Sequence, residues 1–303
     1  MSRLSVILPV YNGMPHLIEA VKSLFNQSYQ DFVVFAIDNG STDGTGKYLT
    51  ELKSEKFKYI RLEEKNLVKA LNKGLDLVDT PFIARMDSDD ISNPTRFEKQ
   101  LDFLNKNSEI GIVGTNGQYI STNGDKHFDI NLPLNHDKII KTMLRKRNAI
   151  IHASIMLRKE VIRLNGFYDA EYFPCEDYEL FLRIGDKIKF ANIPERLYQF
   201  RVRGDSIMSQ HITESIKMYY YINYKYSMKY YNKVIDINVA VNRKLKLYEK
   251  LDVISVSIYR KGLYYFLNVN KLLGLFNFMI ASLINPVRLI SAIKRKIISA
   301  NHY

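Results

Sequence analysis

Apolar runs alternate with amphipathic segments over some 115 residues from the amino terminus. Continuous apolar runs are typical of strands in a parallel sheet that is covered on both faces. Apolar residues that recur every three or four positions predict helices between those strands. The pattern predicts strands at 4–10, 32–37, 59–62, 82–86 and 110–114, and helices at 15–26, 44–55, 67–78 and 95–107. This alternation predicts an α/β fold, a doubly wound and mostly parallel sheet with helices on both faces.

The alternation loosens in the middle of the chain. A hairpin is expected at 117–130, because Thr122-Asn123-Gly124-Asp125 is a strong turn sequence. Further segments with strand or helix patterns come after it. They are helices at 138–146, 159–164 and from Cys175, and strands at 154–157 and 193–203.

The composition changes near Gln210. Residues 211–303 hold 15 Lys+Arg against 4 Asp+Glu, so most of the net charge of +12 lies there, with 12 of the 21 tyrosines. Such a shift favours a domain boundary. We therefore expect an α/β domain at 1–210 and a basic, Tyr-rich helical extension at 211–303.

The 82–86 run ends in the carboxylates of Asp87, Asp89 and Asp90. Open α/β sheets bind ligands at the carboxyl ends of their strands. Asp87 and Asp89 are two positions apart and would share a face of an extended chain, an oxygen-rich site of the kind that a hard divalent cation prefers. The alternative is a capped turn, since Ser92-Asn93-Pro94 is a good helix start. That alternative does not account for the carboxylates.

A second acidic loop comes after the second predicted strand and begins at Asp38. Parallel strands open on the same rim, so Asp38 and Asp87 could face one ligand. Ser41, Thr42 or Asp43 would serve equally as a helix N-cap. Asp38 has no such alternative explanation.

Two further polar clusters lie nearer the carboxyl end of the α/β region. Glu176 and Asp177 open a predicted helix, where the helix macrodipole alone would favour carboxylates. Arg201 and Arg203 alternate on a predicted strand and would either clamp phosphate oxygens or lie on a solvated edge. Both readings stay open for each cluster.

Five stretches of the chain, taken together and in their order, resemble the inverting nucleotide-sugar glycosyltransferases of family 2, which have a GT-A fold. The resemblance covers about residues 4 to 206. The matching stretches are Val6–Asn12, Asp38–Thr45, Ala70–Gly74, Arg85–Asp90 with Pro94 and Arg96, and Glu176–Asp177 with Leu180 and Arg183.

The resemblance implies a role for each matching position. Asp87 and Asp89 would hold Mn²⁺ or Mg²⁺ against the donor diphosphate, and Asp177 would be the catalytic base. One displacement at the sugar carbon implies inversion. The donor, a UDP-sugar by this resemblance, would be bound by Pro9, Tyr11, Asn12, Asp38, Arg85, Asp87 and Ser88.

The chain departs from the family pattern at some positions. Asn66 stands where a glycine is frequent, and asparagine also adopts left-handed backbone conformations. Arg203 replaces a frequent histidine and could bind diphosphate but not a metal ion. His152 matches a position that is often histidine and lies either at the site or in the core. Glu176, His152, Arg201 and Arg203 are therefore secondary candidates.

The most apolar part of the extension is 271–284, too short to span a bilayer. It predicts a helix in the interface of an anionic membrane, helped by Arg288 and Lys294-Arg295-Lys296. The alternative is a helical cap that packs on the α/β domain or on a second subunit of a homo-oligomer. The single cysteine, Cys175, and the lack of a secretory pattern near the amino terminus favour the cytoplasm.

The predicted function is transfer of a sugar to a glycan or lipid-linked acceptor in lipopolysaccharide or capsule synthesis, at the cytoplasmic face of the inner membrane. One alternative is a sugar-phosphate nucleotidyltransferase, which would need a glycine-rich basic loop that Tyr11-Asn12-Gly13-Met14-Pro15 does not offer. Another is a nucleic-acid binder that uses the basic tail. The apolar stretch in the tail argues against nucleic acid as a partner.

Overall fold

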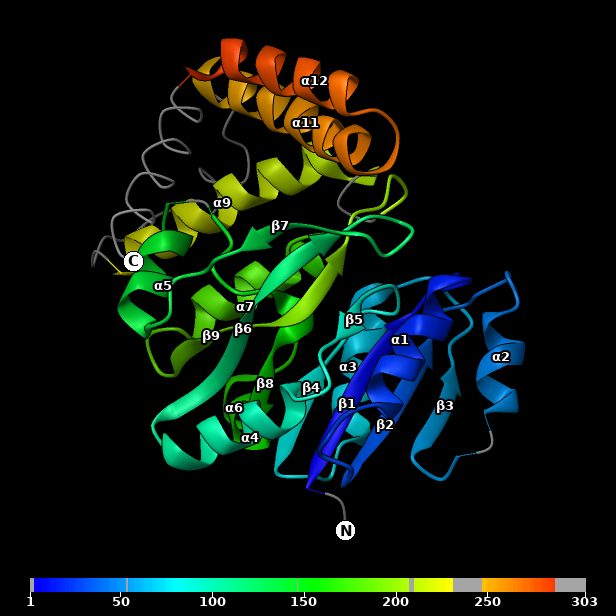
Figure 1. Cartoon of the computed structure of the whole chain (residues 1–303). Coiled ribbons are helices and arrows are strands. Elements are labelled where there is room, and N and C mark those ends of the chain that lie inside the picture. Colours follow the sequence, from blue (N-terminus) through cyan, green and yellow to red (C-terminus); the bar gives the residue numbers. More distant parts are fainter. Residues whose placement is uncertain (1–2, 53, 146, 207–209, 231–246, 287–303) are drawn as a thin grey trace.

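The computed structural model describes residues 3–52, 54–145, 147–206, 210–230 and 247–286 (Figure 1). Its centre is a mixed sheet. The strands are β1 (Leu4–Val10), β2 (Phe32–Asp38), β3 (Phe57–Arg61), β4 (Phe82–Arg85), β5 (Ile91–Ser92), β6 (Ile110–Ile120), β7 (Lys126–Ile130), β8 (Met156–Arg158) and β9 (Lys189–Arg201). Their order in the sheet is β3-β2-β1-β4-β8-β6-β9-β5, and β7 pairs with β6.

The strands β3, β2, β1 and β4 are parallel, as are β6 and β9. The short strand β8 joins the two groups by antiparallel pairing on both of its sides. In the register of β1, Val10 pairs with Asp38 and Ile7 pairs with Arg85. The acidic loops after β2 and β4 therefore open on the same rim of the sheet, one on each side of β1.

Helices cover both faces of the sheet, which confirms the predicted fold class. Alternate residues of β1 explain why: Leu8 lies in the core on one face, and Ile7 in the core on the other. The first core includes residues of α1 (His16–Phe25), α2 (Thr45–Glu51) and α4 (Arg96–Lys106). The second includes residues of α3 (Leu67–Leu77), α5 (His136–Met143), α6 (Lys159–Asn165) and α7 (Glu176–Ile184).

The carboxyl-terminal extension forms the helices α9 (Ile212–Tyr230), α11 (Leu247–Asn268) and α12 (Lys271–Ile284). α9 lies on α7, and its residues Ile222 and Tyr226 belong to the second core (Figure 1). α11 and α12 form a tight antiparallel pair, where a Cβ on Gly274 would come within 2.5 Å of the Phe266 Cβ. Within the described ranges, no helix combines the length and the apolar character that crossing a bilayer requires.

Two local predictions needed correction. Ser92 does not start a helix: it belongs to β5, where it pairs with Tyr198 of β9, and α4 begins only at Arg96. Asn66 does not adopt a left-handed conformation, because its φ is −152° and its side chain caps α3 by accepting from the Lys69 N–H. In both cases a specific partner decided the backbone conformation. The Arg288 and Lys294–Lys296 cluster lies outside the described residues.

Candidate active site

The loops after β1 and β2 are joined by hydrogen bonds. Asn12 has a φ of +46°, and its N–H donates to Ser41 Oγ at 2.9 Å. In return, Asn12 Oδ1 accepts from the Thr42 N–H at 2.9 Å. The Gly13 N–H donates to Thr45 Oγ1 at 2.9 Å. Asparagine tolerates this left-handed backbone conformation. Asn12, which was predicted to bind the nucleotide-sugar, holds the two loops together as one unit through these hydrogen bonds.

Asp38 lies at the base of this unit and is fully buried. Its carboxylate accepts from the Ser41 N–H at 2.9 Å, from the Tyr59 hydroxyl at 3.0 Å and from Arg61 at 2.9 Å. A buried carboxylate needs such partners. Of its predicted companions, Pro9 is buried and Tyr11 is 39% exposed, with the Lys65 ammonium 4.2 Å from the ring centroid. The nucleobase contacts of these residues stay predictions.

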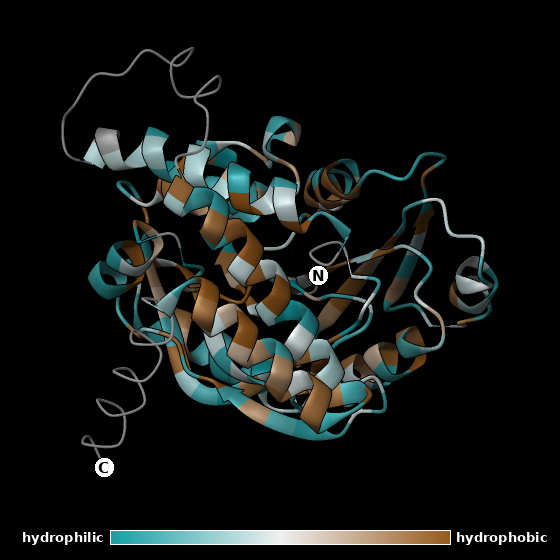
Figure 2. Cartoon of the chain, turned by 90° about the horizontal axis from the view of Figure 1, so that it is seen from above, coloured by the Kyte–Doolittle hydropathy of each residue, from teal (hydrophilic) through white to brown (hydrophobic). Residues whose placement is uncertain are grey.

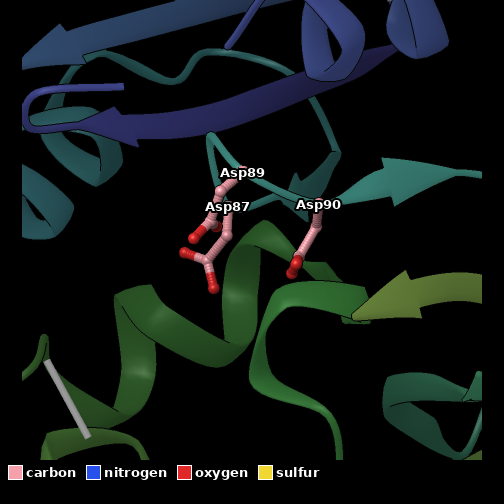
Figure 3. A group of neighbouring side chains, drawn as sticks. All are labelled: Asp87, Asp89 and Asp90. Carbon is pink, nitrogen blue, oxygen red and sulfur yellow. The ribbon is translucent and has the colours of Figure 1, made fainter. Parts of the chain in front are cut away.

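The loop after β4 brings together the carboxylates of Asp87, Asp89 and Asp90, which offer oxygens within 4.8 Å of one another (Figure 3). Arg85 binds both oxygens of Asp87, at 2.8 and 2.5 Å. Arg203 binds Asp89 at 3.2 Å. Burial, and after it the charge of Asp87, raise the pKa of Asp89 to about 6. Ser88 lies between the two carboxylates and is half-buried.

Asp90 was not among the predicted ligands, and the structure shows its separate role. It is buried, and it accepts from the Tyr198 hydroxyl at 2.7 Å and from the Arg201 N–H at 2.8 Å. Burial raises its pKa well above the usual range. The only sequence signal was its place as the third carboxylate in the run. Asp90 thus fixes the acidic loop to β9.

Arg201 is also buried, which contradicts the solvated-edge reading of its strand. Its guanidinium donates to the carbonyls of Asp89, Ser121 and Thr122 and pairs with Glu19 at 2.5 Å. Arg203 lies beyond the end of β9 and binds Asp89 and Asp205. The two arginines meet at Asp89, although β9 ends at Arg201 and does not include Arg203 as the predicted strand did.

The acidic loop fits a divalent cation. Both oxygens of Asp90 have protein donors, whereas the side chains of Asp87 and Asp89 are 30% and 23% exposed. Burial first, and then the charge of Asp87, disfavour the ionised form of Asp89, and a bound cation would stabilise that form. Carboxylate oxygens are ligands that Mg²⁺ and Mn²⁺ prefer. Asp87 and Asp89 are thus the residues that could hold the ion.

Glu176 and Asp177 form the first turn of α7. Asp177 Oδ1 accepts from the Tyr178 N–H at 2.7 Å, and Oδ2 accepts from Asn148 Nδ2 at 3.3 Å. Burial raises the pKa of both acids, and with the added charge of Asp177 it raises that of Glu176 to about 7. Glu176 Oε2 is buried with no hydrogen-bond partner among the described residues. Glu176 lies in the first turn of α7, so interaction with the helix macrodipole stays an alternative explanation for this carboxylate.

The acidic loop after β4 and the start of α7 lie near enough for their charges to interact. The charge of Arg85, which binds Asp87, acts on the pKa of Asp177, Glu176 and His152. His152 Nδ1 lies 4.0 Å from Asp177 Oδ2. The His152 ring also packs against Phe181, so this histidine belongs both to the core and to the edge of the site. The structure thus brings together groups from β4, α7 and the segment before β8.

Comparisons with known proteins identify the family of this chain. Residues 5–164 match the model of glycosyl transferase family 2. The chain is 33% identical over 237 residues to the O-antigen biosynthesis glycosyltransferase WbnJ of Escherichia coli, covering 76% of this chain and 89% of that protein.

Solved structures share the fold at low sequence identity. TarS residues 1–349 from S. aureus, in complex with UDP-GlcNAc, superpose with a TM-score of 0.60 at 14% identity, over 95% of this chain and 92% of that one. The mannosyltransferase PcManGT of Pyrobaculum calidifontis, in complex with GDP-Man and Mn²⁺, has a TM-score of 0.56 at 13% identity, over 100% and 81%. The chain is a glycosyltransferase and belongs to glycosyl transferase family 2.

Proposed function

We propose that the protein is a metal-dependent inverting glycosyltransferase, which moves a sugar from a nucleotide-sugar, a UDP-sugar in the first instance, to a glycan or lipid-linked acceptor. The observation that carries this proposal is the convergence of two acidic centres, Asp87 with Asp89 and Glu176 with Asp177, around Arg85. The nucleotide-sugar complexes of TarS and PcManGT, and the O-antigen role in the name of WbnJ, support it.

On the donor side, Asp87 and Asp89 would hold Mn²⁺ or Mg²⁺, which when bound neutralises charge on the leaving diphosphate. Arg85 orients Asp87 through a two-point contact, and Arg203 is placed to meet phosphate oxygens beside Asp89. The nucleoside would lie on the joined loops after β1 and β2. Its proposed contacts are Pro9, Tyr11, Asn12 and Asp38, and Ser88 would contact the donor between the two carboxylates.

On the acceptor side, Asp177 is the proposed base. It would take the proton from the acceptor hydroxyl as that oxygen attacks the anomeric carbon and the bond to the diphosphate breaks. A single displacement inverts the configuration of that carbon. Burial raises the pKa of Asp177, which makes its carboxylate a stronger base than that of an exposed aspartate.

The test separates donor binding from transfer. We expect Asp87→Asn and Asp89→Asn to weaken Mn²⁺-dependent binding of UDP-sugars at least tenfold, and Asp177→Asn to keep donor binding and lose most transfer. Asp102→Asn, at an exposed carboxylate on α4, is the matched control. Unchanged donor affinity with and without Mn²⁺ in both loop variants would contradict the metal assignment. Retention of anomeric configuration, measured by NMR of the product, would contradict inversion.

We further propose that 1–210 forms the donor-binding and catalytic domain and that 211–303 attaches it to the anionic cytoplasmic face of the inner membrane, where a lipid-linked acceptor lies. An exposed apolar surface on α12 supports this proposal. We call it the α12 face: Leu272, Leu275, Phe276, Met279 and Leu283, each between 52% and 77% exposed. Figure 2 looks down on the helices at the top of Figure 1 and shows the hydrophobic segments of these helices.

The charge around the α12 face suits an anionic bilayer. Lys250, Lys261 and Lys271 are exposed on α11 and α12. The acids of these helices are engaged internally, since Glu249 is buried and Asp252 binds Tyr220 and Asn285. Apolar insertion together with basic residues is sufficient for peripheral binding. A second copy of the chain is the alternative partner of the α12 face. The family assignment argues against the other predicted function, a sugar-phosphate nucleotidyltransferase.

A further inference from the structure

Tyr168 and His152 form a buried pair beside the proposed base. The Tyr168 hydroxyl lies 2.7 Å from His152 Nε2, and the two rings meet edge to face with centroids 5.3 Å apart. Tyr168 is only 6% exposed. The pair reaches the first turn of α7, because the other ring nitrogen of His152 faces Asp177.

Asn72 holds Tyr168 in place from the opposite side. Its Nδ2 donates to the Tyr168 carbonyl at 2.8 Å, and its Oδ1 accepts from the Tyr168 N–H at 3.0 Å. Asn72 lies on α3, 96 residues before Tyr168. These two bonds give a structural reason for an asparagine in the Ala70–Gly74 stretch. A continuous chain of contacts thus runs from α3 through Tyr168 and His152 toward Asp177.

The hydrogen bonds assign the His152 tautomer. Burial, reinforced by the charge of Arg85, lowers the pKa of His152 well below its usual value, so the imidazole is neutral and carries one N–H. Burial raises the pKa of Tyr168, so its phenol keeps its proton and can donate it to Nε2. The phenol could also accept, but the Asp177 carboxylate near Nδ1 can only accept, so the imidazole proton belongs on Nδ1. This N–H faces Asp177 Oδ2 across 4.0 Å, a distance that a small rotation or one bridging water closes.

We propose that His152 is a positioning residue for Asp177, held in its tautomer by Tyr168. This inference rests on the proposed role of Asp177 as the base. Tyr178 N–H holds Oδ1 and Asn148 holds Oδ2. The His152 N–H adds a second donor to Oδ2, so that the carboxylate keeps one orientation and presents its remaining lone pairs to the acceptor hydroxyl. Small displacements of a reacting group are costly: about 1 Å can reduce the rate by about 100-fold.

The test compares His152→Leu with His152→Asn, whose amide nitrogen can take the place of Nδ1. In steady-state transfer assays we expect His152→Leu to lower kcat by about 10- to 100-fold while the donor KM and donor Kd change less than about twofold. His152→Asn should recover a large part of the lost kcat. Tyr168→Phe should lower kcat by about three- to tenfold with the same unchanged donor binding.

His136→Leu is a matched control, because His136 also packs edge to face on an aromatic ring, Phe190, but lies on α5. It should change kcat little. Wild-type kcat in both His152→Leu and Tyr168→Phe would overturn the proposal. Equal losses of kcat and donor affinity, or a His152→Asn variant as slow as His152→Leu, would also overturn it.

The controls also separate this inference from the proposed function. If Asp177→Asn retains wild-type turnover, the base itself is wrong. If Asp177→Asn is inactive but the His152 and Tyr168 variants are fully active, only the positioning role falls. Tyr168→Phe removes a single oxygen, so it carries the test if His152→Leu does not fold.

Discussion

The hydroxyl oxygen of Tyr198 lies 2.7 Å from Oδ2 of Asp90, and it also accepts from the Asp87 N–H at 3.2 Å. Tyr198 is on β9, more than 100 residues from the acidic loop. One phenol therefore fixes both ends of the loop that carries the proposed metal ligands. The position of this loop depends on the pairing of β9 with β5 and β6.

Tyr198→Phe should loosen the acidic loop without removing any carboxylate. Asp90 would lose a buried donor, so we expect the free energy of unfolding to fall by about 1–3 kcal/mol in urea denaturation. Mn²⁺-dependent binding of UDP-sugars should weaken several-fold in calorimetry. Tyr259→Phe, at a tyrosine that is 52% exposed, is the control. Full donor affinity in Tyr198→Phe would show that the loop is held by other contacts.

Glu176 should make stability depend on pH. Burial and the charge of Asp177 raise its pKa from 4.5 to about 7. A raised folded-state pKa means that this contribution to stability is fully present below pH 4.5 and is lost as the pH rises through 7. The loss approaches about 3 kcal/mol, an order-of-magnitude figure.

Glu176→Gln removes this titration, and the structure leaves Glu176 Oε2 without a partner that the substitution would break. The variant should therefore be more stable than wild type at about pH 8, and the two should converge near pH 4.5. Urea denaturation at several pH values across this range measures the difference. A parallel pH dependence in both proteins would show that folding does not shift the pKa of Glu176.

The α12 face should decide membrane binding. We expect the full chain to co-float with vesicles that contain anionic lipid, and Leu272→Ser, Phe276→Ser and Met279→Ser combined to reduce co-flotation at least tenfold, since each apolar side chain contributes about 1.5–3 kcal/mol on burial. Leu134→Ser combined with Leu164→Ser, at exposed leucines outside the extension, is the matched control.

Three outcomes would contradict membrane binding by this face. Equal co-flotation of the variant and the wild type would show that other residues bind the vesicle. A wild type that does not float but sediments as a dimer, with the variant monomeric, would make the α12 face a subunit interface. Binding to RNA with a steep salt dependence, in place of vesicles, would support the nucleic-acid alternative.

Much of the fold could be predicted from local patterns. The continuous apolar runs of β1 and β2 and the helical spacing of α1 and α3 reproduce the observed elements closely, because parallel strands and their covering helices carry strong periodicity. The expectation that the loops beginning at Asp38 and Asp87 open on one rim of the sheet agrees with the register of β1. These features depend on neighbours in the sequence.

Contacts between distant segments could not be predicted in the same way. β5 has only two residues and exists because Ser92 pairs with Tyr198. The Asn72–Tyr168 contact and the burial of Arg201 likewise depend on segments that meet only in three dimensions. For Arg201, alternation along a strand did not reveal that Asp89, Ser121 and Thr122 supply carbonyls on the inner side.

Asn223→Ala tests how the extension supports α7. Asn223 lies on α9, is buried, and donates to the Met143 carbonyl at 3.2 Å and to the Tyr178 hydroxyl at 3.4 Å. Loss of these bonds should lower the free energy of unfolding by about 1–2 kcal/mol. Because Tyr178 is the next residue after Asp177, kcat should also fall by a few-fold. A stability loss with unchanged kcat would limit α9 to a structural role.

The packing of α9 on α7 bears on how such enzymes can be recombined. Ile222 and Tyr226 pack in the same core as Phe181. Removing the chain after residue 210 would therefore expose an apolar surface on α7, the helix that begins with Glu176 and Asp177. A chimera that grafts a foreign tail onto this enzyme would have to keep α9 and exchange only the part of the chain beyond Tyr230. Evolutionary exchange of membrane anchors or oligomerisation modules should meet the same constraint.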